Sequence, residues 1–195
     1  MAWDTARTQQ LLLDAAVEEF AEFGPDGARI ARVATRAGVN KERIYQYFGS
    51  KEQLFSAVLT CELAKLAEAV PLVVEEAADF GDYAGRVFDY HSAHPHFSRL
   101  LAWEGLQRGK ATDELAAEAE RAAHLGEKVA AVAAAQRGGG IIDEVDAGRM
   151  MFAMISMVNS WITLPQMARL LLGGSADPAA DREALATLVR RMARP

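Results

Sequence analysis

The chain has 195 residues, 51% hydrophobic and 25% charged, and this balance excludes a disordered, collagen-like or low-complexity protein. A single cysteine excludes an internal disulfide, and no Cys/His set has zinc-finger spacing, so a structural zinc site of that kind is excluded too. The net charge of −6 would disfavour a nucleic-acid partner if it were evenly spread. Because the first ten residues lack the pattern of an export signal, we expect a cytoplasmic protein.

The first predicted helix covers residues 7–23, where apolar residues recur every three or four positions as in an amphipathic helix. Gly24, which is followed by a proline, ends this helix. A second, short helix is predicted over residues 30–37, whose apolar positions share one face, and it closes at Gly38.

A third helix is predicted over residues 41–48. Asn40 precedes it and is a suitable N-cap, because its side-chain oxygen can accept a hydrogen bond from a free amide of the first turn. Ser50 and Gln53 have the spacing of a capping box, which predicts that a longer helix begins there.

The rest of the chain keeps a helical periodicity, without the sustained alternation that indicates strands. We therefore expect an all-α protein with a helix-turn-helix domain over residues 1–49 and a larger helical domain over residues 50–195. Polar residues and a proline interrupt the apolar stretch 150–172, which falls short of the roughly 20 residues of a membrane span. The later helices are expected near residues 79–94, 95–108, 112–136, 144–172 and 180–193, with breaks at Pro95, Gly109, Gly138–Gly140 and residues 173–178.

The two short helices and the glycine-containing turn between them have the pattern of a helix-turn-helix unit. Ala34 is small enough for the helices to approach closely, and Gly38 can adopt the left-handed conformation that the turn needs. Val39 and Ile44 provide apolar contacts beneath the turn. The outer face of the second short helix then carries side chains that can reach base edges in a major groove, namely Lys41, Glu42, Arg43 and Gln46.

A basic segment covers this unit, so the charge of the chain is uneven. Residues 29–51 contain six basic residues and one glutamate, a net charge of +5, whereas the remaining 15 basic and 26 acidic residues give −11. A concentrated positive segment is typical of a protein that binds phosphate groups. The alternative is a solvated helical face on which basic residues cluster by chance.

Four sequence motifs follow one another at fixed spacings over about residues 8–59. They are LLLDAAVEEFAEFG, VATRAGV (33–39), IYQYF (44–48) and SKE (50–52). In these motifs the chain resembles the TetR family of bacterial transcriptional regulators. It departs from the family just before the second helix, where Ala28 and Arg29 stand in place of the usual capping threonine.

The resemblance implies two groups of DNA contacts around the third helix. Bases would be read by Lys41, Arg43 and Gln46, and the DNA backbone would be contacted by Tyr45, Tyr47 and Lys51. Because a cation in the first turn of a helix opposes the helix dipole, the position of Lys51 also favours a phosphate contact. Arg29 could bind phosphate in place of the missing threonine. Core packing is the alternative for the two tyrosines and the preferred interpretation for Phe48.

The resemblance also implies a C-terminal domain that dimerises through its last two long helices, here 144–172 and 180–193, and holds a pocket for a small-molecule effector. Residues 150–162 are apolar nearly all round, so their helix must be covered on several sides. Methionines suit a pocket for varied ligands, although core or interface packing is the preferred interpretation here. The candidate pocket residues are His91, Phe97, Leu101, Trp103, Met151, Met154 and Trp161.

Three histidines, His91, His94 and His96, lie within six residues and could suggest a metal site. Pro95 breaks the helix between them, and no carboxylate or cysteine stands beside them in the sequence, so we predict neither a metal nor a cofactor. The remaining interpretations are a helix corner near the surface and a pocket wall from which a histidine donates to a ligand.

The sequence therefore predicts a ligand-responsive regulator, expected to be a repressor, that binds a palindromic operator as a homodimer and is released by an apolar or amphipathic small molecule. An enzyme with Glu104, His91 or His124 as acid or base is disfavoured, because no nucleophile motif, cofactor loop or metal signature is present. A third interpretation is a helical interaction module without DNA binding, which the missing threonine favours slightly.

Overall fold

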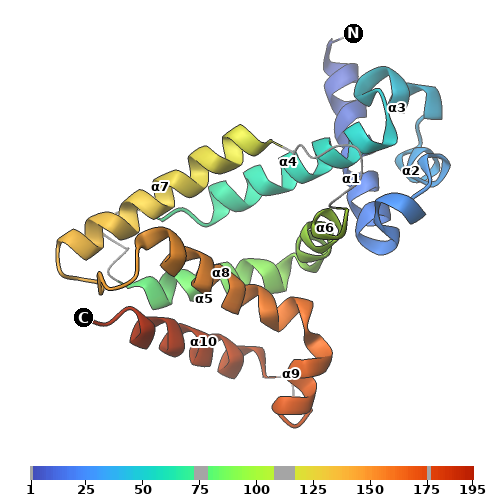
Figure 1. Cartoon of the computed structure of the whole chain (residues 1–195). Coiled ribbons are helices and arrows are strands. Elements are labelled where there is room, and N and C mark those ends of the chain that lie inside the picture. Colours follow the sequence, from blue (N-terminus) through green and yellow to red (C-terminus); the bar gives the residue numbers. More distant parts are fainter. Residues whose placement is uncertain (1, 73–78, 108–116, 175–176) are drawn as a thin grey trace. The chain divides into compact units, whose positions relative to one another are not determined.

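The computed structural model describes residues 2–72, 79–107, 117–174 and 177–195, and these residues form helices and no strands (Figure 1). The expected all-α class is thereby confirmed. The helices are α1 (Ala2–Gly27), α2 (Ile30–Ala37), α3 (Lys41–Phe48), α4 (Lys51–Ala69), α5 (Phe80–Ala93), α6 (Pro95–Leu106), α7 (Glu118–Arg137), α8 (Ala147–Thr163), α9 (Pro165–Leu171) and α10 (Pro178–Met192).

The chain divides into two compact units, each described here by itself. The first unit combines residues 1–65 with residues 96–118, so α6 belongs with the N-terminal helices. Its core contains the ring of Phe20 edge-on to that of Phe55, with centroids 5.1 Å apart. The fully buried apolar side chains of this core come from α1, α2, α3, α4 and α6, and they include Leu12, Phe20, Val33, Ile44, Leu54, Val58 and Leu100.

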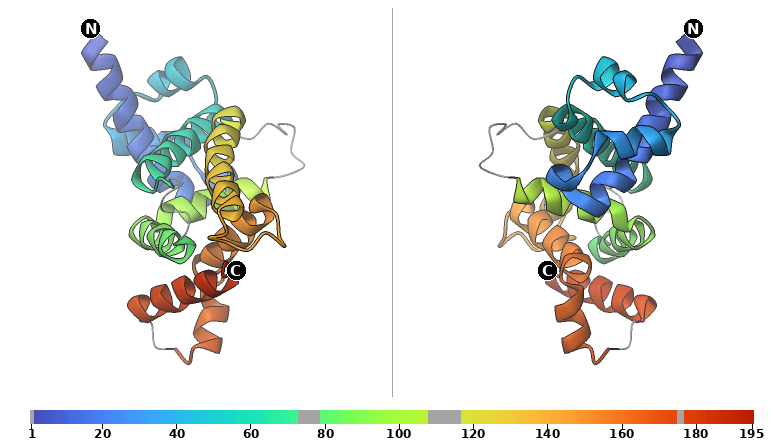
Figure 2. Two further views of the ribbon diagram at one scale, coloured as in Figure 1. Left: turned by 90° about the vertical axis from the view of Figure 1, so that its left-hand side faces the viewer. Right: turned by 90° about the vertical axis from the view of Figure 1, so that its right-hand side faces the viewer.

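The second unit combines residues 66–95 with residues 119–195. In it α5 packs against α8 and α10, and Figure 2 shows the same three helices from two further sides. Gly81 allows the close approach of α5 and α10, because a Cβ there would collide with the carbonyl oxygen of Ala186. An ion pair between Arg182 and Asp89, 2.7 Å long, joins the same two helices at their surface.

The expected helix over residues 144–172 is two helices, so the prediction of one continuous helix was wrong. Leu164, between α8 and α9, has non-helical angles of φ −122° and ψ 49°. Pro165 is the cause, since it has no N–H to continue the helical hydrogen bonds and disfavours the helical conformation of the residue before it.

The two short helices predicted over residues 30–37 and 41–48 coincide with α2 and α3. Gly24, at φ 68° and ψ 171°, interrupts α1 where the first helix was expected to end. The expected break at Gly109, the start of the helix expected at residue 112, and residues 175–176 of another break lie outside the described residues. The domain boundary near Gly49 stays a prediction. No helix in the described part of the chain is long and apolar enough to cross a membrane.

Candidate nucleic-acid interface

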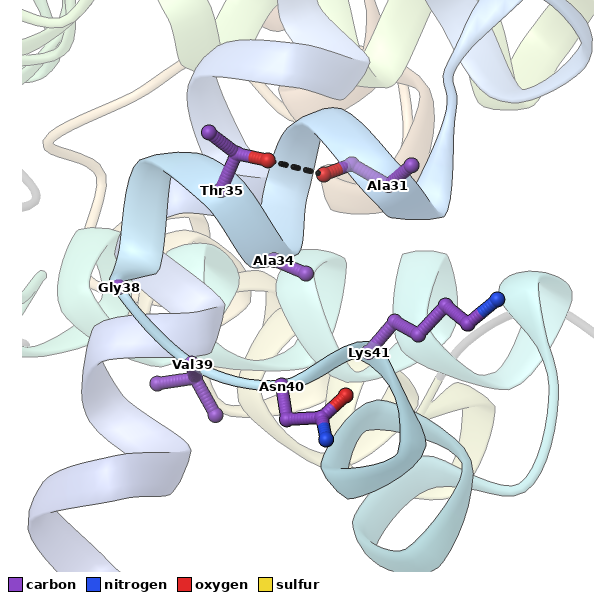
Figure 3. A pocket seen from close by; sticks show the side chains of 7 residues that line it. All are labelled: Ala31, Ala34, Thr35, Gly38, Val39, Asn40 and Lys41. Carbon is purple, nitrogen blue, oxygen red and sulfur yellow. Dashed lines mark hydrogen bonds between the residues drawn. The ribbon is translucent and has the colours of Figure 1, made fainter.

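The turn between α2 and α3 is built as the sequence predicts. Gly38 has a left-handed φ of 65°, and its N–H donates to the carbonyl oxygen of Thr35 at 3.2 Å. The N–H of Val39 donates to the carbonyl oxygen of Ala34 at 3.0 Å, which completes the C-terminal cap of α2. The outer side of the turn is a shallow hollow, which Figure 3 shows between the two helices; it is lined by Ala31, Ala34, Thr35, Gly38, Val39, Asn40 and Lys41.

Helix α3 has one buried face and one exposed face. Ile44 is fully buried beneath it, and the side chain of Asn40 accepts a hydrogen bond from the N–H of Glu42 at 3.4 Å, as predicted for an N-cap. Tyr47 and Phe48 are partly buried against the core of the first unit. The exposed face carries Lys41, Glu42, Arg43, Tyr45 and Gln46. This exposure meets the requirement for contacting DNA, and the contacts themselves stay predictions.

The start of α4 lies close to the end of α1. The hydroxyl of Ser50 accepts a hydrogen bond from the N–H of Gln53 at 3.1 Å, which is one half of the predicted capping box. The ammonium of Lys51 donates to the carbonyl oxygen of Asp26 at 3.4 Å. The predicted phosphate ligand Lys51 is therefore held near the corner that follows α1.

Not every cation of the basic segment is available to DNA. Arg32 forms an ion pair with the buried carboxylate of Glu19 at 2.6 Å, and Arg36 lies 3.4 Å from Glu18. Of the basic side chains among the described residues of this segment, Arg29, Lys41 and Arg43 are exposed and make no ion pair. These three are therefore the cations that are best placed for phosphates and base edges.

Sequence reasoning missed Glu19, which is fully buried. Its Oε1 atom accepts hydrogen bonds from the backbone N–H of Arg29 at 2.8 Å and from Nε of Arg32 at 2.7 Å. Burial alone would raise the pKa of this carboxyl, but the hydrogen bonds and the positive charges of Arg32 and Arg36 outweigh burial and lower it. The signal was present, since Glu19 is an acidic residue inside the apolar stripe of α1.

Glu62 on α4 is a second buried carboxylate that sequence reasoning missed. It accepts from Nζ of Lys65 at 2.7 Å and lies 2.9 Å from Nε2 of His96 on α6. Burial opposes its ionisation, but the hydrogen bonds from Lys65 and His96 outweigh burial and lower its pKa. A carboxylate therefore lies beside one of the three histidines, His96, although none stands beside them in the sequence.

Helix α6 is also tied to the end of α1. The ring of Trp103 packs directly on Gly24, and the guanidinium of Arg99 donates to the carbonyl oxygen of Glu22 at 3.3 Å. Leu101 and Trp103 are partly buried against the core of the first unit, and Phe97 is fully buried. These three candidate pocket residues thus lie on a helix that belongs to the first unit.

The other four candidate pocket residues lie in the second unit. His91 on α5 is buried, and burial together with the nearby His94 lowers its pKa to about 4. On α8, Met151 and Met154 are buried, whereas Trp161 is half-buried. The indole N–H of Trp161 is buried and finds no acceptor among the described residues. The structure therefore separates the seven candidates between the two units.

His94 makes local contacts. His94 stacks on Tyr90 with ring centroids 4.2 Å apart, and its Nδ1 lies 2.8 Å from the carbonyl oxygen of Tyr90. Across the described part of the chain, no group of three or more His, Cys, Asp or Glu side chains is arranged to hold a metal ion.

Exposed apolar side chains gather on the helices that the sequence assigns to a dimer interface. Phe152 on α8 is 74% exposed, and Leu171 at the end of α9 is 76% exposed. Further exposed apolar side chains on or beside α8, α9 and α10 are Leu164, Met167, Leu170, Leu172 and Leu188. Exposed apolar side chains that form a contiguous patch are typical of a protein-protein interface.

Two family models match the chain. The model for bacterial regulatory proteins of the tetR family matches residues 12–58, and the model for the tetracyclin repressor-like C-terminal domain matches residues 79–191. The HTH-type transcriptional repressor SCO4008 of Streptomyces coelicolor is 42% identical over 193 residues, which cover 98% of this chain and 97% of that protein. The HTH-type transcriptional repressor NicS of Pseudomonas putida is 37% identical over 107 residues, which cover 53% of this chain and 50% of that protein.

Solved structures share the fold. The transcriptional regulator SCO4942 of Streptomyces coelicolor superposes with a TM-score of 0.82 at 34% identity, covering 96% of this chain and 99% of that one. The regulator FadR of Bacillus subtilis, in complex with stearoyl-CoA, has a TM-score of 0.69 at 16% identity, covering 94% and 98% of the two chains, which shows a common fold alone.

The helix-turn-helix unit and the helical C-terminal domain thus define a DNA-binding transcriptional regulator. The chain belongs to the TetR family of bacterial regulatory proteins.

Proposed function

We propose that this protein is a repressor that binds a palindromic operator as a homodimer and releases it when a small apolar or amphipathic molecule binds its C-terminal domain. The observation that carries the proposal is the exposure of α3, whose side chains Lys41, Arg43 and Gln46 are open to solvent while Ile44 is buried. The repressors SCO4008 and NicS, which are similar to this chain, support repression as the direction of regulation.

In this proposal α3 lies in the major groove. Lys41 and Arg43 donate to guanine, and Gln46 pairs with adenine. Phosphate contacts fix the position of the helix on the duplex and come from Arg29, Tyr45, Tyr47 and Lys51. Two copies of α3 read two half-sites about 34 to 36 Å apart, which is one turn of B-DNA.

The effector is proposed to bind in the second unit, beside His91, Met151, Met154 and Trp161. The buried indole N–H without an acceptor and the polarisable methionines suit a ligand with an apolar body and a polar group. Leu101 and Trp103 are assigned to bracing the first unit instead, because they pack on its core. A ligand that binds more tightly to a conformation with a different separation of the two recognition helices shifts the dimer away from the conformation that binds the operator. The ligand weakens operator binding by no more than the difference in its binding free energy between these two conformations.

The proposed DNA contacts can be tested by single substitutions on α3. Arg43→Ala and Lys41→Ala are each expected to weaken binding to the DNA upstream of the gene by about 1 to 3 kcal/mol, because each removes a donor to a base edge. Affinity is measured by mobility-shift titration at fixed salt concentration, since salt alone changes it strongly.

The matched control is Arg137→Ala, which removes the same charge from the exposed end of α7. It is expected to leave affinity for the operator unchanged. Equal effects of Arg43→Ala and Arg137→Ala would contradict the assignment of α3, and a wild-type chain without specific, salt-dependent binding at micromolar concentration would contradict regulation by DNA binding.

The proposed dimer interface can be tested on α8. Phe152→Glu places a charge where an apolar side chain, 74% exposed in the single chain, would be buried by a second copy. Sedimentation velocity is expected to show a dimer for the wild type and a monomer for Phe152→Glu at the same concentration. Leu106→Glu, at a 71% exposed position on α6, is the control and is expected to remain a dimer. A monomeric wild type would rule out the proposed interface.

A further inference from the structure

Burial of the Glu19 carboxylate costs free energy, and only one of its two oxygens is hydrogen-bonded within the described part of the chain. The side chain has no exposed surface, and its Oε1 atom is contacted by three donors, namely the N–H of Arg29 at 2.8 Å and Nε and Nη2 of Arg32 at 2.7 and 2.6 Å. Its Oε2 atom is buried and has no partner among the described residues. Because an apolar side chain often stabilises such a position as well as a buried ion pair does, stability alone does not explain a glutamate here.

These contacts fix the start of α2 from a neighbouring helix. The N-cap residue of α2 is Arg29, whose backbone is extended and whose side chain makes no capping hydrogen bond, and the first turn of α2 contains no acidic residue. In a capping box, a glutamate of the same helix accepts the N–H of the N-cap residue. Here Glu19 of α1 accepts that N–H, so the orientation of Arg29 depends on α1.

The same carboxylate keeps Arg32 at the α1–α2 corner. The guanidinium of Arg32 also donates to the carbonyl oxygen of Gly27 at 3.1 Å and lies 4.2 Å above the ring centroid of Phe23. Arg32 is therefore bound within the protein, and Arg29 is the exposed cation that remains at the start of α2.

We propose that Glu19 is a positioning residue for DNA binding, which holds the backbone of Arg29 so that its guanidinium reaches a phosphate of the operator. This proposal rests on the proposed function, because it assumes that the protein binds an operator. Glu19 itself contacts no DNA and acts through Arg29.

Electrostatics and positioning make opposite predictions for substitutions at this position. If Glu19 only added negative charge beside DNA, Glu19→Leu and Glu19→Gln would both tighten binding, and Glu19→Asp would change nothing. If Glu19 positions Arg29, Glu19→Gln keeps an acceptor oxygen at the same reach and retains most of the affinity. Glu19→Asp keeps the charge, but its side chain is one methylene shorter and places the carboxylate farther from the N–H of Arg29. This variant therefore loses affinity for the operator.

The experiment measures operator affinity and its dependence on salt concentration for the wild type, the three variants, Arg29→Ala and the double variant Glu19→Asp/Arg29→Ala. Arg29→Ala is expected to weaken binding roughly tenfold and to reduce the slope of log K against log salt by about 1, as for the loss of one phosphate contact. Glu19→Asp is expected to reproduce most of this loss and the lower slope. The double variant is expected to bind no more weakly than Arg29→Ala alone.

Three results would overturn the proposal. They are a Glu19→Asp variant that binds as tightly as the wild type, a Glu19→Gln variant that binds more tightly, and losses that multiply in the double variant. Far-UV circular dichroism and thermal unfolding establish that each variant is folded, and the comparison of Glu19→Gln with Glu19→Asp decides the question even if Glu19→Leu does not fold. Failure of the proposed function gives a different result, since the wild type then binds no operator and Lys41→Ala has no effect.

Discussion

Lowering the pH from 7 to 5 is expected to reduce the free energy of unfolding by about 2 kcal/mol through His91 alone. Burial, reinforced by the nearby His94, lowers the pKa of His91 to about 4, whereas the ordinary value is 6.5. Between these two values the unfolded chain binds a proton that the folded chain does not, so stability is lost as the pH falls through this window. Urea unfolding at the two pH values measures the effect.

The variant that tests this origin is His91→Gln, which has no titrating group at this position. Its stability is expected to change between pH 7 and pH 5 by about 2 kcal/mol less than that of the wild type. His124→Gln, on the exposed face of α7, is the control and should keep the wild-type pH dependence. An unchanged pH dependence in His91→Gln would show that other groups carry it. The pKa values of Glu19 and Glu62 are lowered from the ordinary value of 4.5, so these two carboxyls change the free energy of unfolding mainly below that pH.

Replacing Gly24 by alanine is expected to destabilise the first unit by about 2 to 6 kcal/mol, the sum of two effects. At φ 68° and ψ 171°, an L-residue costs about 1 to 3 kcal/mol in backbone strain. The new Cβ would also lie 2.8 to 2.9 Å from three ring carbons of Trp103, and overpacking of this kind costs another 1 to 3 kcal/mol or so.

The control for this substitution is Gly105→Ala on α6, two residues from Trp103. A Cβ at Gly105 meets no atom within 4 Å, so alanine is expected to stabilise the helix by up to about 1 kcal/mol. Chemical denaturation of the two variants should therefore give shifts of opposite sign. Shifts of the same size and sign would mean that the contact between α6 and the end of α1 does not constrain Gly24.

The helix-turn-helix unit was predictable because its determinants are local. Gly38, Asn40 and the apolar positions of α2 and α3 specify the turn and both helices within a short stretch of sequence, and the structure matches them. Pro165 is an equally local signal for the end of α8, but the apolar pattern continues on both sides of it and obscures the break.

Other features depend on residues that only the fold brings together. The partner of Glu19 is thirteen positions away in the next helix, and Glu62 pairs with His96 on α6 as well as with Lys65 on its own helix. A buried carboxylate can be suspected from its place in an apolar stripe, but a partner on another helix cannot be read from spacing. The seven candidate pocket residues come from two segments of the sequence, and the structure divides them between the two units because α6 packs with the N-terminal helices.

The membership of α6 in the first unit bears on how the chain folds during synthesis. The N-terminal helices emerge from the ribosome first, but Leu100 and Trp103, which complete their packing, emerge only after the whole of α5. A nascent chain that ends before α6 leaves the apolar surface that these two side chains cover open to solvent, and such surfaces favour aggregation. The DNA-binding unit is therefore completed late, although it contains the first residues of the chain.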